Sequence, residues 1–294
     1  MLPTFIGIGA PKAGTTWLAK CLGEHPEVFM AAVKEVDFFK YPDFGDRVPL
    51  YASHFVGAEG YKAVGEFTVR YFALPDAPQR IRQLLPNARL LLCLRNPVDQ
   101  VVSHYWHLHR QNFHTLDHRS APNSIEEAIE RFPEALLSPA RYSFHLERWF
   151  KEFPREQMLV LLYDDINQFP EKVLQQTYGF LGVAPSFNPA AIRDKGLSVR
   201  QGTSPRNAFL ARLHRTCYSF LTRGAYGPLK QLIGTRRAAR LKDSLRIRET
   251  MNLVFMRKGY PPPAPQTRQH LRSLFAEDIS RLETMLQLDL SRWK

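Results

Sequence analysis

The sequence predicts an α/β fold in three layers, with a central, mainly parallel sheet flanked by helices. Short apolar runs alternate with longer segments whose apolar residues have helical spacing, as in parallel sheets with right-handed crossovers. The run at 89–94 is almost continuously apolar, which is typical of a central parallel strand. The first apolar run leads into a glycine-bearing loop. Because no internal repeat or low-complexity linker interrupts this pattern, we expect a single domain over 1–294.

The first part of the chain contains three predicted strands. Phe-Ile-Gly-Ile-Gly at 5–9 is a short buried strand, and a loop joins it to a helix over about 15–22. A second short strand covers 63–66. The run Arg-Leu-Leu-Leu-Cys-Leu at 89–94 is the strongest strand signal of the sequence. A helix begins directly after it at Asn96-Pro97, since proline is favoured in the first helical turn.

The second part contains one more predicted strand, set among helices. Apolar residues at 158–163 form this strand, which ends in two aspartates. Helical spacing covers 141–153 before it and 171–181 after it. Three consecutive prolines at 261–263 separate a last amphipathic helix, about 266–286, from the rest of the chain.

Composition is that of an ordinary globular protein. Of the 294 residues, 44% are hydrophobic and 23% are charged, which argues against disorder. No apolar run approaches the about 18 residues that a membrane helix needs, and we interpret 1–10 as a strand and not as a signal peptide. Cys21, Cys93 and Cys217 are scattered and odd in number. They predict neither a disulfide framework nor a zinc site, and they fit a reducing, cytoplasmic location.

The net charge of +12 is concentrated in one segment. Residues 193–258 carry 16 lysines and arginines against three acids, whereas residues 1–192 have a net charge of −2. Such a segment favours an anionic partner, which could be nucleotide phosphates, an acidic polymer or a membrane surface. A solvated helix face would explain the same charges. We expect no nucleic acid as partner, because no nucleic-acid-binding motif accompanies them.

The loop after the first strand has the features of a phosphate-binding loop. Gly9 and Gly14 have the spacing G-x-x-x-x-G, and a glycine-bearing turn between a strand and a helix directs backbone N–H groups and the helix dipole at an anion. In nucleotide triphosphatases a lysine follows the second glycine. Here Thr15 holds that position and the lysine is Lys12, inside the loop. The loop can therefore hold phosphates but is not built like that of an ATP-hydrolysing enzyme.

The loop closely resembles the 5′-phosphosulfate loop of sulfotransferases that use 3′-phosphoadenosine 5′-phosphosulfate (PAPS). The residues that carry the resemblance and would bind the donor are Lys12, Ala13, Gly14, Thr15, Thr16 and Trp17. The resemblance implies that Lys12 lies at the oxygen that bridges phosphorus and sulfur. A positioned ammonium there stabilises the negative charge that grows as the S–O bond breaks.

A second motif follows the strongest predicted strand. Arg95 stands at the strand end and Ser103 eight residues later, which resembles the family's 3′-phosphate site. The carboxyl end of a parallel strand is where α/β sheets bind ligands, and the planar guanidinium suits phosphate. Lys195 and Arg200 lie where relatives place a loop over the adenine and the 3′-phosphate. The closing segment is also similar to the C-terminal helix of bacterial members.

Three residues are candidates for the general base that removes the acceptor proton. The segment Lys-Glu-Val-Asp-Phe-Phe is similar to the Lys-Glu-x-His-Phe-Phe segment of heparan-sulfate-type members, which implies that Glu35 is the base and that the acceptor is a carbohydrate hydroxyl. Asp37 stands where that pattern has histidine, and this difference concerns how the acceptor is positioned. Glu66, at the end of a predicted strand, is the rival, and His104 is the third candidate.

Other functions are weighed against this hypothesis. A nucleotide-dependent phosphotransferase would share the sheet and the loop but would need a lysine after Gly14. A basic protein without enzymatic activity would bind anions, or an anionic surface, through 193–258. We expect no metal, because no histidine–carboxylate cluster has ligand spacing. The acceptor, which could be a glycan, a glycolipid, a small molecule or a peptide, and the oligomeric state are left open by the sequence.

Overall fold

The structure is a computed structural model that describes residues 1–110, 113, 116, 122–193, 203–205 and 256–294. The chain groups into two compact units, Met1–Arg200 with Pro263–Lys294, and Gln201–Pro262. In the second unit the described residues form an antiparallel pair of short strands, β6 (Thr203–Pro205) and β7 (Met256–Lys258). All other elements below belong to the first unit. The expectation of one domain stays a prediction.

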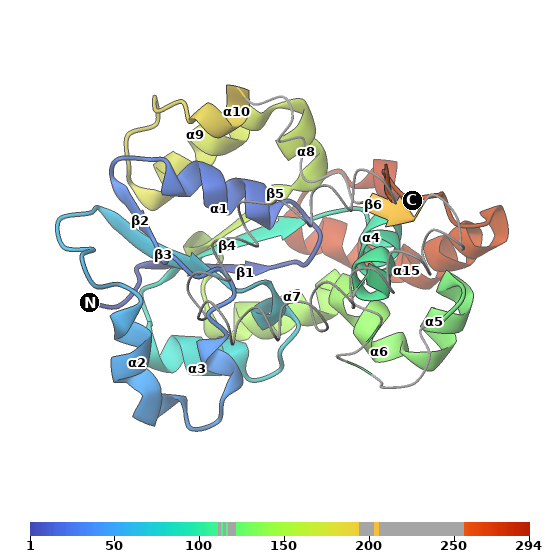
Figure 1. The fold of residues 1–294 in the computed structure, drawn as a ribbon, viewed down its shortest axis with the longest axis horizontal. Helices are drawn as coiled ribbons and strands as arrows, with labels where there is room; N and C mark the ends of the chain where they lie inside the picture. Colours follow the sequence, from blue (N-terminus) through green and yellow to red (C-terminus); the bar gives the residue numbers. More distant parts are fainter. Residues whose placement is uncertain (111–112, 114–115, 117–121, 194–202, 206–255) are drawn as a thin grey trace, which may run out of the picture. The chain divides into compact units, whose positions relative to one another are not determined.

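A five-stranded parallel sheet forms the centre of the first unit (Figure 1). Its strands lie in the order β2-β3-β1-β4-β5, and all four neighbouring pairs are parallel. The strands are β1 (Phe5–Gly9), β2 (Val28–Met30), β3 (Ala63–Phe67), β4 (Arg89–Leu94) and β5 (Met158–Leu162). The predicted fold class is confirmed. The short edge strand β2 was not predicted from the sequence, because only one of its three residues is buried.

Helices cover both faces of the sheet. Figure 1 shows α1 and α9 on one face and α3 and α7 on the other. The α-helices are α1 (Thr15–Gly23), α2 (Val48–Ser53), α3 (Ala77–Leu84), α4 (Pro97–Arg110), α5 (Ile125–Arg131), α6 (Pro133–Leu136), α7 (Tyr142–Glu152), α8 (Tyr163–Gln168), α9 (Pro170–Leu181), α10 (Ala190–Arg193) and α15 (Pro265–Leu286). Short 3-10 turns are η1 (Phe38–Lys40), η2 (Phe44–Arg47), η3 (Val69–Phe72), η4 (Ser138–Ala140), η5 (Arg155–Gln157) and η8 (Ser291–Trp293). The predicted helices are present with bounds that differ by one or two residues.

Two glycines let aromatic rings lie flat across the central strands. Phe5 of β1 is paired with Gly65 of β3, and Gly7 of β1 is paired with Phe67. A Cβ atom on Gly65 would lie 2.4 Å from the ring of Phe5, and one on Gly7 would lie 2.0 Å from the ring of Phe67. Glycine, which weakens most strands, is therefore needed at both positions by the packing of the core.

The C-terminal helix α15 packs against other helices of the first unit. Its buried residues occur at three- and four-residue intervals and pack against α4 and α7. Asp278 of α15 accepts hydrogen bonds from the backbone N–H groups of Tyr142 and Ser143, at 2.9 and 3.1 Å. These groups would otherwise lack partners, because the first N–H groups of a helix have none within it. A carboxylate from a distant segment thus fixes the start of α7.

Candidate functional site

The carboxyl edge of the sheet brings the two predicted anchors together. In the sheet order β1 and β4 are neighbours. From β1 the chain continues to β2 and β3 on one side of this pair, and from β4 it continues to β5 on the other side. Such a switch in strand order is where open α/β sheets bind ligands. The N–H group of Ala10, just after β1, donates to the carbonyl of Cys93 in β4 over 2.7 Å. The predicted loop and Arg95 therefore begin at adjacent points of one edge.

The backbone of the loop is held in an uncommon conformation. Lys12 has φ 66° and Gly14 has φ 95°, both in the left-handed region. A Cβ atom on Gly14 would lie 3.1 Å from Cδ1 of Ile166 and 3.3 Å from the ring of Tyr163, so the loop lies directly against α8. Helix α1 begins at Thr15 with no acidic residue in its first turn and no side chain capping it. Its N–H groups and dipole are therefore directed at the loop.

Two side chains from the β4–α4 region fix this loop from the other side. Arg95 donates from Nη1 to the carbonyl of Lys12 over 3.3 Å, and its guanidinium lies 4.4 Å from the ring centre of Tyr163. Gln100, which is fully buried on α4, donates from Nε2 to the carbonyl of Pro11, also over 3.3 Å. Gln100 was not predicted as a site residue. In the sequence it is distinguished only as an amide among the apolar residues of the predicted helix.

The other predicted donor-binding residues differ in exposure. Ala13, Gly14, Thr15 and Trp17 are buried, and the side chain of Thr16 is exposed at the start of α1. Ser103 is buried on α4, the helix that follows Arg95. Lys195 and Arg200 lie outside the described residues, as does most of the basic segment 193–258.

Glu35 is a reachable carboxylate beside the end of β3. Its backbone N–H donates to the carbonyl of Phe67, the last residue of β3, over 2.8 Å. Its Oε2 accepts the N–H of Val69 over 2.9 Å, and its Oε1 accepts Nζ of Lys34 over 2.6 Å. The side chain is nevertheless 37% exposed. A carboxylate held by two donors and open to solvent on one side can receive a proton from a bound molecule.

Glu66, in contrast, is completely buried. Its Oε2 accepts the hydroxyl of Thr68 over 2.7 Å and its Oε1 accepts the hydroxyl of Tyr51 over 3.3 Å. Burial raises the pKa of Glu66 from 4.5 to about 7, the two hydroxyl donors oppose this rise, and the charge of Glu35 adds to it. The two carboxyl groups predicted as rival bases are therefore close enough to influence each other, yet only Glu35 is exposed.

His104 lies on α4 near the predicted lysine. Burial, together with the nearby charges of His107 and Lys12, lowers the pKa of His104 to about 3. Its Nδ1 is buried and has no hydrogen-bond partner among the described residues. His107, which was not predicted as a site residue, has its pKa lowered to about 4 by burial and by the charge of Lys12. Both imidazoles are therefore neutral near pH 7 and close to the loop.

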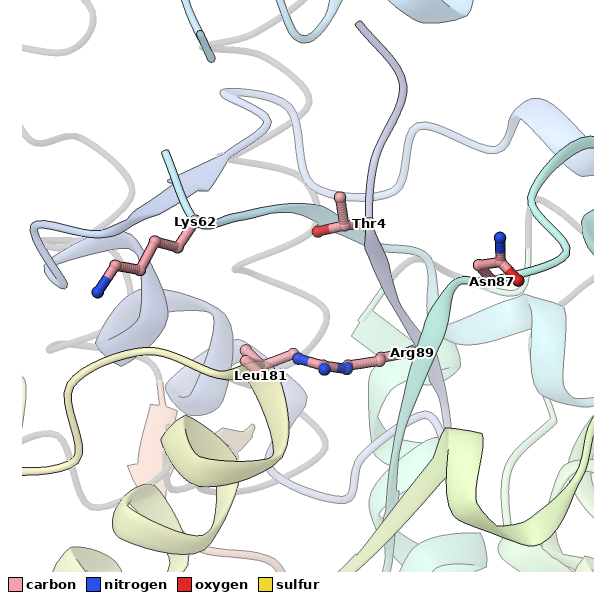
Figure 2. Close-up of a pocket in the computed structure, with 5 residues that line it drawn as sticks. All are labelled: Thr4, Lys62, Asn87, Arg89 and Leu181. Atoms are coloured by element: carbon pink, nitrogen blue, oxygen red, sulfur yellow. The ribbon is translucent and has the colours of Figure 1, made fainter. Parts of the chain in front are cut away.

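A surface hollow of about 260 Å³ lies away from this site (Figure 2). It is lined by Thr4, Lys62, Asn87, Arg89 and Leu181. Three of these residues precede or begin β1, β3 and β4, so the hollow lies at the amino edge of the sheet, opposite the loop. Lys62 is already paired with Glu27 over 2.5 Å. The hollow is therefore not a better candidate for the functional site than the carboxyl edge of the sheet.

Metal and membrane sites were searched in the same part of the chain. Within the described ranges, no three histidine, cysteine, aspartate or glutamate side chains are grouped so that they could hold a metal ion. Nor does any described helix combine the length and the apolar character needed to cross a membrane.

Comparisons with known proteins agree with this geometry. The family model described as "Sulfotransferase domain" matches residues 2–199. The bifunctional heparan sulfate N-deacetylase/N-sulfotransferase 3 of Mus musculus is 30% identical over 204 residues, which cover 64% of this chain and 23% of the relative. The corresponding enzyme 2 of Homo sapiens is 28% identical over 200 residues, with the same two coverages. The chain thus matches less than a quarter of the length of these relatives.

A solved structure is similar to this chain and supports the same fold. The crystal structure of a sulfotransferase from Alicyclobacillus acidocaldarius aligns with a TM-score of 0.69 and 25% sequence identity, and the alignment covers 100% of this chain and 99% of that one. The sheet order, the loop after β1 and the family match over two thirds of the sequence lead to one conclusion: the chain belongs to the sulfotransferase family, as its sequence motifs predicted.

Proposed function

We propose that this sulfotransferase takes the sulfuryl group from PAPS and transfers it to a carbohydrate, with Glu35 as general base. The observation that carries the proposal is the convergence of Lys12, Arg95 and Glu35 at the carboxyl edge of one sheet. The names of the curated relatives, which describe N-sulfation of heparan sulfate, support a sugar acceptor. Both a hydroxyl and an amine of a sugar can attack sulfur, so the proposal covers either group.

The residues of the loop fit a donor with two phosphate groups. The loop offers Lys12, the N–H groups at the start of α1 and the hydroxyls of Thr15 and Thr16 for the 5′-phosphosulfate. Arg95 forms no ion pair with a carboxylate among the described residues, and it contacts a carbonyl and the face of Tyr163. A guanidinium held in this way is suited to a 3′-phosphate. Lys12 would stabilise the charge on the leaving oxygen.

Glu35 is preferred to its two rivals because of exposure and charge. A base must come within hydrogen-bond distance of the acceptor. Glu66 has no exposed surface, and the pKa of His104, lowered to about 3 mainly by burial, makes its imidazole a weak base. The side chain of Glu35 is accessible, and the ion pair with Lys34 and the hydrogen bond from the N–H of Val69 hold it in place.

Calorimetric titration with adenosine 3′,5′-bisphosphate tests the donor site. We expect micromolar or tighter binding that Arg95→Ala weakens at least tenfold, whereas Arg89→Ala, an arginine at the opposite edge of the sheet, leaves it unchanged. ATP with magnesium serves as the comparison ligand. Binding of ATP with magnesium and not of the bisphosphate would instead support a nucleotide-dependent phosphotransferase.

Turnover with labelled PAPS tests the acceptor. We would offer a polysaccharide of alternating glucuronic acid and N-acetylglucosamine, the same polymer after removal of its acetyl groups, and free glucosamine. Label on the deacetylated polymer alone would identify the amine as acceptor, and label on both polymers would identify a hydroxyl. Binding of the bisphosphate with no labelled sugar in any arm would contradict the carbohydrate proposal. In each productive arm Glu35→Gln should lower turnover by about 10²-fold or more, with a measurable residual rate, and leave bisphosphate binding intact.

A further inference from the structure

The segment that presents Glu35 has a backbone that would not hold its shape alone. Glu35 has φ 66° and Asp37 has φ 60°, so two residues with side chains, one position apart, lie in the left-handed region. This region is unfavourable for residues other than glycine, and it persists only where surrounding contacts determine it. The conformation of this segment must therefore come from its neighbours.

One stretch of chain, the end of β3 and the turn η3, forms most of the hydrogen bonds to the backbone and side chain of this segment. Four hydrogen bonds join the two segments: Glu35 N–H to the Phe67 carbonyl at 2.8 Å, Val69 N–H to Glu35 Oε2 at 2.9 Å, Asp37 N–H to Thr68 Oγ1 at 3.2 Å, and Phe39 N–H to the Tyr71 hydroxyl at 3.3 Å. Two of the four acceptors are side-chain hydroxyls, whose hydrogens can rotate.

The direction of the Thr68 hydroxyl is decided by Glu66. A hydroxyl has one hydrogen, and in Thr68 it is donated to Oε2 of Glu66 over 2.7 Å. The lone pairs of Oγ1 are therefore left for the N–H of Asp37. The other carboxyl oxygen of Glu66 accepts the hydroxyl of Tyr51, whose ring stacks on Phe38 at 4.1 Å between centres. Glu66 thus orders the Glu35 segment from two directions.

We propose that Glu66 is a positioning residue, which holds the Glu35 segment in place through the hydroxyls of Thr68 and Tyr51. The proposal rests on the proposed function, in which Glu35 is the base. Glu66 itself does not touch the acceptor, because it is completely buried. It holds the same two hydroxyl donors throughout the reaction, and no proton leaves the network.

The described surroundings of Glu66 consist of hydroxyl groups and a second carboxylate. Tyr51 of α2 and Thr68 donate to it, Tyr71 also lies close enough to affect it, and the charge of Glu35 raises its pKa. Among the described residues no lysine or arginine forms an ion pair with Glu66. Burying a carboxyl group without a paired cation costs free energy of folding. Such a cost is expected where the group serves the functional site.

The first test uses Thr68→Val, which keeps the shape of the side chain and removes the hydroxyl. We expect kcat with labelled PAPS to fall about tenfold or more, since small displacements of a base have effects of this size. Bisphosphate affinity should stay unchanged, and hydrogen exchange of the Asp37 amide should become faster. Thr68→Ser should restore both kcat and the slow exchange. The matched control is Thr177→Val, which removes a buried hydroxyl bond of 2.7 Å in α9 and should leave kcat unchanged.

The second test shows whether the network acts through Glu35. In a Glu35→Gln background the further loss from Thr68→Val should disappear, because no base remains to be positioned. Wild-type kcat in Thr68→Val, or an equal further loss in both backgrounds, would overturn the positioning role. Glu66→Gln, which keeps one acceptor oxygen for Thr68, should retain more activity than Glu66→Leu. If Glu35→Gln alone has wild-type kcat, the proposed base is wrong, and that result is separate from the outcome for Thr68.

Discussion

The buried carboxyl of Glu66 should make the stability of this protein depend on pH in a way that Glu66→Gln removes. The glutamine keeps the size of the side chain and an acceptor oxygen, but it cannot ionise. Burial raises the pKa of Glu66 from 4.5 to about 7 in the folded protein. The unfolded chain therefore ionises this group first as pH rises, and folding must then keep a proton on it or carry a buried charge.

The size of the effect follows from the two pKa values. For an acid with a raised folded pKa, the stability is fully present below about pH 4.5 and is lost as pH rises through about 7. A rise from 4.5 to about 7 corresponds to a loss of about 3 kcal/mol, at about 1.4 kcal/mol per pKa unit. Above about pH 8 the difference between wild type and variant should become constant.

Urea unfolding between pH 4 and pH 8 measures this difference. The free energy of unfolding of wild type should fall by about 3 kcal/mol relative to Glu66→Gln over this range. Other carboxyl groups are shared by both proteins and cancel in the comparison. The control is Glu27→Gln, at a partly buried carboxylate whose pKa is lowered first by the hydrogen bond from Lys62, so its effect has the opposite sign. A difference between wild type and Glu66→Gln that does not change with pH would refute the reasoning.

Three further substitutions test the loop and its supports. Gly14→Ala combines φ 95° with a Cβ atom 3.1 Å from Ile166, so we expect bisphosphate affinity to fall about tenfold by calorimetry. Gln100→Leu loses the bond to the Pro11 carbonyl but also removes a buried oxygen that has no partner among the described residues. Its free energy of unfolding should change by less than about 1 kcal/mol while bisphosphate affinity falls, and lost stability with full affinity would contradict this. Trp293→Phe removes the hydrogen bond that the indole N–H donates to Asp164 over 2.8 Å. The free energy of unfolding in urea should fall by about 1 kcal/mol. An unchanged urea midpoint would show that this hydrogen bond contributes nothing.

The position of the proposed donor half of the site could be predicted because it is local in sequence. Lys12 lies in the loop after one strongly apolar strand and Arg95 follows directly on another, and in a parallel sheet the carboxyl ends of strands share one edge. Hydrophobic patterning therefore placed both residues without any knowledge of distant contacts. The short strand β2, which has no such pattern, was missed.

The acceptor half depends on contacts that no local pattern reveals. Glu66 stands in a short apolar strand and could be interpreted from the sequence as a base at a strand end. Its complete burial follows from Tyr51, which is 15 residues earlier in the chain and packs across it. The contact of Gln100 with Pro11 joins residues 89 positions apart. Polar contacts of this kind depend on tertiary packing. The spacing of apolar residues, with a period of two in strands and 3.6 in helices, does not reveal them.

The charges around Glu35 also limit what this part of the site can do. Lys34 pairs with Glu35, Lys40 pairs with Asp37, and Arg47 pairs with Asp43. Residues 34–47 carry three cations and four carboxylates, the fourth being Asp46, so the turn has no excess positive charge with which to attract a polyanion. Since these pairs are partly exposed, each contributes little to stability. If the acceptor is an acidic polysaccharide, its attraction must therefore come from other parts of the protein, while the turn orients the sugar and receives its proton.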